Sequence, residues 1–315
     1  MLSLESEYRE LHAAGAIDDA VASRGIAAET GTAFSVAEEL RAVIYGAVAA
    51  IMAGIGIILK TNLQRIGPMS LLIGVAVAAA GCYAPAIRAQ LRHATRSTAA
   101  DYLLLLGALL VSADLGYAES QFHWLGPHWS LHLLILFAVH AATAYAVDSR
   151  LVLSLSLTSL AAWFGIEGNV FKIVQEGNAL TQSGVRSLVC AGVIYAWREV
   201  HRRLRALQPF QETFEHFAAN LGFWGAIGLC VGSNTHLVGV ICLAVLAAAS
   251  IRYGLRRARE IFVIYGVGYA ALGLICLEMQ LITSSLLGAV TQLVTVVAAV
   301  MLAWHLHRRV RAMPS

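Results

Sequence analysis

Ten long runs of apolar residues, separated by short polar loops, constrain this chain more than any other feature of its sequence. The hydrocarbon core of a bilayer is about 30 Å thick, so a helix needs about 20 predominantly apolar residues to cross it. Backbone polar groups find no water there, so each run is expected to be helical. The sequence therefore predicts an all-α, polytopic membrane helix bundle with about ten transmembrane helices. The runs lie at residues 42–60, 67–87, 98–117, 128–147, 150–166, 182–200, 213–232, 236–253, 260–280 and 284–305.

The composition excludes several classes of protein. Of the 315 residues, 58% are hydrophobic and 13% are charged, whereas soluble domains carry about 25% charged residues. A water-soluble globule could not hide so much apolar surface, and a disordered chain would be far more polar. No basic stripe interleaved with exposed aromatic residues is present, so a nucleic-acid partner is not predicted.

The positions of the basic residues predict the orientation of the chain. Eighteen of the 22 Lys and Arg residues fall in the N-terminal segment, in the loops after the second, fourth, sixth and eighth runs, and in the C-terminal tail. The other four, Lys60, Arg65, Lys172 and Arg186, lie toward the opposite side. Basic residues are enriched on the cytoplasmic side, so we expect both termini in the cytoplasm. Whether the short fifth run fully spans is left open.

The first forty residues read as a cytoplasmic segment of two short amphipathic helices, followed by a linker. Leu4, Tyr8 and Leu11 fall at helical spacing, and a second helical pattern begins near Ile17. Helices this short are marginal alone, so we expect them to pack on the membrane domain or on a protein partner. We expect three divisions. They are a cytoplasmic helical segment at residues 1–40, which includes the linker at 25–32, the transmembrane domain at 41–307 and a cytoplasmic tail at 308–315.

Ionisable residues inside or beside the runs are costly in lipid and are therefore functional candidates. His128 and His132 stand four residues apart, a spacing that can chelate a metal on one helix face. No recognised ligand signature accompanies them, so no metal or cofactor is predicted. These groups could bond to loops, form a site for an ion, proton or small solute, or bind metal or haem. The candidates for this outer-side polar site are Asp114, Glu119, His123, His128, His132, His140 and Glu278.

A second candidate site is basic. Arg198, Arg202 and Arg205 share one face of the segment 197–209, which could contact the head groups of anionic lipids at the cytoplasmic surface. The alternative is a basic helix extension that only follows the orientation rule. Small residues within the runs, such as the Gly-x-x-x-Gly of Gly228 and Gly232, predict close helix packing.

Several stretches resemble an uncharacterised bacterial family of membrane proteins, the domain of unknown function 2157. They are the Ala-Gly-Ala-Ile of residues 14–17, the Gly-Ile-Gly-Ile-Ile-Leu-Lys-Thr-Asn of 54–62, residues 106–163 and residues 259–266. Residues 106–163 contain the motifs Gln-Phe-His at 121–123 and His-Trp at 128–129. The resemblance implies a multi-pass inner-membrane protein with a small cytoplasmic N-terminal segment. It implies no activity.

Three hypotheses of function follow. The chain could bind or move a small solute, ion or proton from the outer side, which requires Asp114, His132 and Glu278 to converge. It could be an accessory or scaffold subunit that binds a partner through residues 1–38 or through its spans. It could be a membrane-embedded metal- or haem-dependent enzyme, although no catalytic motif is recognisable.

Overall fold

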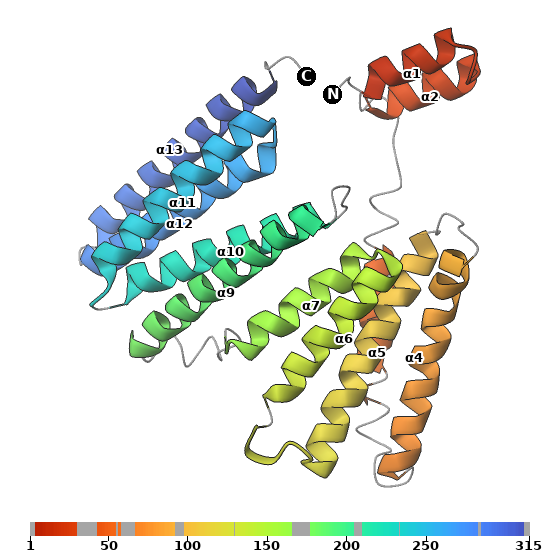
Figure 1. Cartoon of the computed structure of the whole chain (residues 1–315). Coiled ribbons are helices and arrows are strands. Elements are labelled where there is room, and N and C mark those ends of the chain that lie inside the picture. The colour runs from red at the N-terminus through yellow and green to blue at the C-terminus, as the bar shows by residue number, and fades with distance from the viewer. Residues whose placement is uncertain are drawn as a thin grey trace. The chain divides into compact units, whose positions relative to one another are not determined.

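The fold was analysed in a computed structural model, which describes residues 4–29, 43–54, 56–57, 67–91, 98–128, 130–165, 177–204, 210–232, 234–282 and 285–311. Within these residues the regular structure is entirely helical, which confirms the all-α prediction (Figure 1). The chain divides into two compact units. One comprises Met1–Lys60 with Ala312–Ser315, and the other comprises Thr61–Arg311.

The first unit begins with two helices that pack against each other, α1 (Leu4–Ala13) and α2 (Asp19–Glu29). Asp18 accepts a hydrogen bond from the backbone N–H of Val21 at 2.7 Å and so caps α2. The ring of Tyr8 lies so close to Gly25 that a Cβ there would stand 2.6 Å from it. The linker predicted at 25–32 is therefore wrong at its start, because Gly25 gives space to the neighbouring helix and α2 continues past it. The helix Val43–Gly54 follows in the same unit.

The second unit is a series of helices whose positions match the remaining apolar runs. Together with Val43–Gly54, each of the ten predicted runs coincides with one helix. They are α4 (Pro68–Leu91), α5 (Thr98–Phe122), α6 (Leu131–Val147), α7 (Arg150–Trp163), α9 (Gly177–Leu204), α10 (Gln211–Val231), α11 (His236–Arg257), α12 (Glu260–Leu281) and α13 (Ser285–Arg311).

Five of these helices are long and apolar enough to cross a membrane. They are Pro68–Arg88, Ala99–Phe122, His236–Arg257, Glu260–Gln280 and Ser285–Val310. Val43–Gly54, α6 and α7 are shorter, and the 14 residues of α7 extend only about 21 Å. α9 and α10 are long but carry charged residues at the ends where they adjoin. Several membrane-spanning helices are thus supported, whereas the count of ten and the orientation stay predictions.

Consecutive helices pair, and α10 lies at the centre of the second half. α4 packs on α5, α6 on α7, α9 on α10, and α11 on α12, while α10 also contacts α7, α11 and α12. The α6–α7 and α11–α12 turns have the same form: a left-handed residue, Asp148 or Ala258, then an extended one, Ser149 or Arg259. These tight turns place an arginine beside the start of α10 on each side.

Glycines bring the backbones of α9 and α10 into direct contact. A Cβ on Gly184 would stand 2.8 Å from the carbonyl oxygen of Gly225, and one on Gly228 would stand 3.1 Å from the Cα of Gly184. The Gly-x-x-x-Gly that begins at Gly228 therefore faces a close helix neighbour, as its sequence predicts.

We expect Gly184→Ala to destabilise the fold by about 1–3 kcal/mol, because the added methyl group meets backbone atoms that cannot move aside. Gly192→Ala on the same helix is the matched control. Its Cβ would meet nothing within 4 Å, and alanine is the better helix former by about 1 kcal/mol. Chemical unfolding in mixed micelles, followed by circular dichroism, measures both. Equal stability of the two variants would contradict the close contact of α9 with α10.

Candidate functional site

The two outer-side candidates on α5, Asp114 and Glu119, differ in their hydrogen bonds. Glu119 is buried, and its carboxylate accepts the backbone N–H of Leu125 at 3.2 Å, which closes the loop after α5. Asp114 is half-buried, and its Oδ1 accepts no hydrogen bond from the described residues. Glu119 is therefore a loop cap, while Asp114 keeps the character of an unsatisfied polar group.

His128 and His132, the pair whose spacing could chelate a metal, do not lie on the same helix. α6 begins only at Leu131, and His128 ends a separate short 3₁₀ turn, Gly126–His128. The helix expected from 128 onward is wrong at that end, since Gly126 takes a positive φ of 55° and begins the separate turn that ends at His128. His123 also has a positive φ and is exposed. The two-histidine chelate on a single helix is therefore not formed.

His140 and Glu278 bond to neighbouring helices. His140 is fully buried, and its Nε2 lies 2.8 Å from Oγ of Ser112, which links α6 to α5. Thr295 of α13 donates to Oε1 of Glu278 at 2.7 Å. α12 packs against α10, α11 and α13, whereas Asp114 and His132 lie on α5 and α6. The convergence of Asp114, His132 and Glu278 stays a prediction, and no group of three or more ligand-type residues in the described ranges is arranged to hold a metal.

A denser polar cluster lies at the arginine-rich ends of the helices, around Glu215 of α10. Its carboxylate is 6% exposed. Arg198 of α9 donates to it at 2.5 Å, Arg259 of the α11–α12 turn at 3.2 Å, and Gln211 at 2.9 Å. Because α10 packs against α9, α11 and α12, this one side chain reaches groups from all sides.

Further ion pairs extend the cluster. Glu212 lies 3.2 Å from Arg150 of α7 and 3.4 Å from Arg259. Glu199 lies 2.5 Å from Arg202, 3.6 Å from Arg198 and 3.7 Å from Arg203. Exposed pairs of this kind contribute little to stability, because solvent screens them. Loss of one partner from a buried pair costs about 3–5 kcal/mol, so Glu215 with Arg198 dominates the energetics.

Glu215 is ionised at neutral pH. Burial raises the pKa of its carboxyl, but the hydrogen bonds from Gln211, Arg198 and Tyr253, together with the charge of Arg198, outweigh burial and leave the pKa below its usual value. Glu215 lies at the polar start of α10, outside the five candidate spans. Arg198 is also fixed from its other side, since its guanidinium lies 5.4 Å from the centre of the Tyr195 ring.

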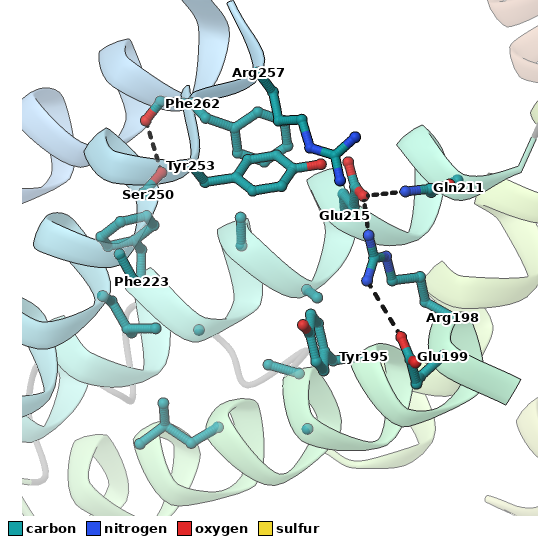
Figure 2. Close-up of a pocket in the computed structure, with 18 of the residues that line it drawn as sticks. Tyr195, Arg198, Glu199, Gln211, Glu215, Phe223, Ser250, Tyr253, Arg257 and Phe262 are labelled. Carbon is teal, nitrogen blue, oxygen red and sulfur yellow. Dashed lines mark hydrogen bonds and ion pairs between the residues drawn. The ribbon is translucent and has the colours of Figure 1, made fainter. Parts of the chain in front are cut away.

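A cavity of about 850 Å³ opens beside this cluster, between α9 and α11 with α10 beneath; we call it the α9–α11 groove. Figure 2 shows Arg198, Glu215 and Arg257 at one end of the groove and Phe223 toward the other. Small and apolar residues line the end near Phe223, which we call the apolar end; the end near Arg198 is the charged end. The lining residues used below are Leu188, Gly192, Arg198, Glu199 and Arg202 of α9, Glu215, Gly222 and Phe223 of α10, and Leu246, Ala249 and Arg257 of α11.

The candidates drawn from the sequence overlap this groove only in part. Arg198 and Arg202, predicted as lipid head-group contacts, do line it, but Arg198 is already paired with Glu215. Arg205 lies outside the described residues. Glu215 was missed although it lies within the run 213–232, where the rule that flags ionisable residues in spans applies to it.

The comparisons with known proteins match part of the chain to a family and give no activity. Residues 9–153 match the family described as "Predicted membrane protein (DUF2157)", which confirms the resemblance for that part of the chain. No curated protein and no solved structure matches the chain. The α9–α11 groove lies C-terminal to the matched residues.

We expect Glu215→Gln to lower the free energy of unfolding by about 3 kcal/mol at neutral pH, because it leaves Arg198 buried opposite a neutral amide. The folded-state pKa of Glu215 is depressed. Its contribution is therefore present above the usual carboxyl pKa and is lost as the pH falls through the lower folded-state value. The wild type should lose stability in that acidic window more steeply than the variant.

Glu212→Gln is the control for this prediction, since Glu212 lies less than one turn away and is 46% exposed. Its effect should stay within about 1 kcal/mol. Unfolding in mixed micelles as a function of pH measures both variants. A Glu215→Gln variant as stable as Glu212→Gln would show that the buried pair does not hold the helix ends together.

Proposed function

We propose that this membrane protein, whose residues 9–153 match a family of predicted membrane proteins, binds a small amphipathic anion in the α9–α11 groove. The observation that supports the proposal is the division of the groove into a charged end and an apolar end. Ligand pockets enclose about 300–1,000 Å³, are mostly apolar, and fix orientation with a few polar groups. The volume of about 850 Å³ falls in this range.

The charge balance favours an anion over a cation. Three arginines and two glutamates line the groove: Arg198, Arg202, Arg257, Glu199 and Glu215. Both glutamates are already paired with arginines. Within the described ranges, no carboxylate pairs with Arg257. A cationic ligand would have to compete for paired carboxylates, whereas an anionic group meets unused guanidinium donors.

The side of access differs from the first hypothesis drawn from the sequence. The arginine-rich ends of α9 and α11 belong to the loops that the orientation rule assigns to the cytoplasm. A groove that opens there takes its ligand from the cytoplasmic side. The alternatives of an accessory subunit and of a metal- or haem-dependent enzyme stay hypotheses, and the groove favours neither.

Thermal unfolding with added amphiphiles tests the proposal. The full chain in a neutral detergent is mixed with an alkyl phosphate or with an alkylammonium of the same chain length. The alkyl phosphate should raise the melting temperature, because a ligand that binds only the folded state stabilises it. The alkylammonium should not.

Gly192→Phe should remove this shift by filling the groove, since nothing lies within 4 Å of a Cβ at this position. Gly268→Phe on α12 is the matched control, because its Cβ also meets nothing within 4 Å and it does not line the groove. A shift of equal size in Gly192→Phe and wild type, or equal shifts by both amphiphiles, would contradict the proposal.

A further inference from the structure

The depth of the groove matches one leaflet of a bilayer. On α9, 11 residues separate Leu188 at the apolar end from Glu199 at the charged end, and 11 residues likewise separate Leu246 from Arg257 on α11. Each interval corresponds to about 16 Å at 1.5 Å per residue. The hydrocarbon core is about 30 Å thick, so the groove extends over about half of it.

The groove also has an open flank between its walls. α9 and α11 both pack on α10, and they do not pack closely against each other in the described residues. Gly192 and Ala249, one on each wall, are exposed, and a Cβ on Gly192 would meet nothing within 4 Å. A chain lying in the bilayer could therefore enter from the side without first passing through water.

The three arginines at the charged end differ in how many of their N–H donors are already used. Arg198 is 11% exposed and is held by Glu215. Arg202 is 57% exposed and donates two hydrogen bonds to Glu199, at 3.1 and 2.5 Å, which leaves three of its five N–H donors. Arg257 is exposed and, within the described ranges, has no carboxylate partner. Arg202 and Arg257 can thus donate to an anionic group while Arg198 keeps Glu215 in place.

From this match of depth, open flank and charge we infer that the groove binds a lipid of the leaflet at the arginine-rich side. Its anionic head group lies on Arg202 and Arg257, and its acyl chain lies along Leu188, Phe223 and Leu246. The inference rests on the proposed function and names the class of ligand.

A free phosphate or a short soluble anion fits less well. Such a ligand would satisfy the arginines but would leave the apolar end uncovered, and burial of apolar surface contributes about 25 cal/mol per Å². Anionic lipids are also concentrated at the surface where the orientation rule places these arginines. Shape and charge therefore both favour the lipid.

Native mass spectrometry of the delipidated full chain tests this inference. The protein in a neutral detergent is mixed with phosphatidylglycerol or with phosphatidylcholine of the same acyl chains, and retained lipid is measured. The wild type should retain phosphatidylglycerol in preference. Arg202→Gln with Arg257→Gln should lower that retention about tenfold, toward the level of phosphatidylcholine, because charge-assisted bonds to the head group are lost. Gly192→Phe should lower the retention of both lipids.

The control is Arg252→Gln with Arg256→Gln, which removes the same charge from exposed positions outside the groove lining. It should retain phosphatidylglycerol as the wild type does. Equal loss in this control would show general attraction to basic surface and would overturn the inference. All variants are first required to melt near the wild-type temperature without ligand, and Arg257→Gln alone serves if the double variant does not.

Two further outcomes separate this inference from the proposed function. Excess glycerol phosphate that displaces phosphatidylglycerol would refute the lipid assignment and leave anion binding standing. Equal retention of the two lipids, together with a shift of the melting temperature by alkyl phosphate, would have the same meaning. If neither lipid is retained and alkyl phosphate causes no shift, both fail.

Discussion

The charged end of the groove depends on the interactions of one group, the ionised carboxylate of Glu215. It accepts hydrogen bonds from Arg198 of α9 and Arg259 of the α11–α12 turn, and so joins the helices on both sides of α10. An ion with 6% exposure is costly to bury unless it is fully paired. The pairing fixes where α9 and α11 end relative to α10, and it leaves Arg202 and Arg257 as the groups that can respond to a ligand.

The opposite end of the groove is set by close contacts between backbones. Gly184 of α9 meets Gly225 and Gly228 of α10, and Gly239 of α11 lies against the backbone of Cys230. These contacts all lie toward the end of α10 that is opposite Glu215. Nearer the charged end, Gly222 leaves its neighbours at ordinary van der Waals distances, with Leu246 at 3.5 Å from an added Cβ. Close packing at one end and ion pairing at the other thus leave room between them.

The helices were predictable because lipid as a solvent admits few alternatives. Each predicted apolar run coincides with a helix. Errors arose at Gly126 before α6, where a turn intervenes, and at Gly25 within α2, where the glycine gives space to Tyr8. The groove was not predictable in the same way. Periodicity shows that Glu215 lies on a helix, but only the packing of α9, α11 and α12 around α10 shows that it meets Arg198 and Arg259. The orientation rule drew attention to acids on the outer side, and the helical pattern grouped Arg198 with Arg202 as contacts of one kind. Ion pairing in fact distinguishes these arginines: Arg198 is held by Glu215, whereas Arg202 and Arg257 keep N–H donors for a ligand.

A lipid with an anionic head group in the α9–α11 groove would be visible directly. An experimental structure of the full chain in nanodiscs that contain phosphatidylglycerol tests this most directly. We expect elongated density between α9 and α11, with the head group at Arg202 and Arg257 and the acyl chain reaching Leu188 and Leu246. Closure of α9 onto α11, or occupation of the groove by another part of the chain, would contradict it.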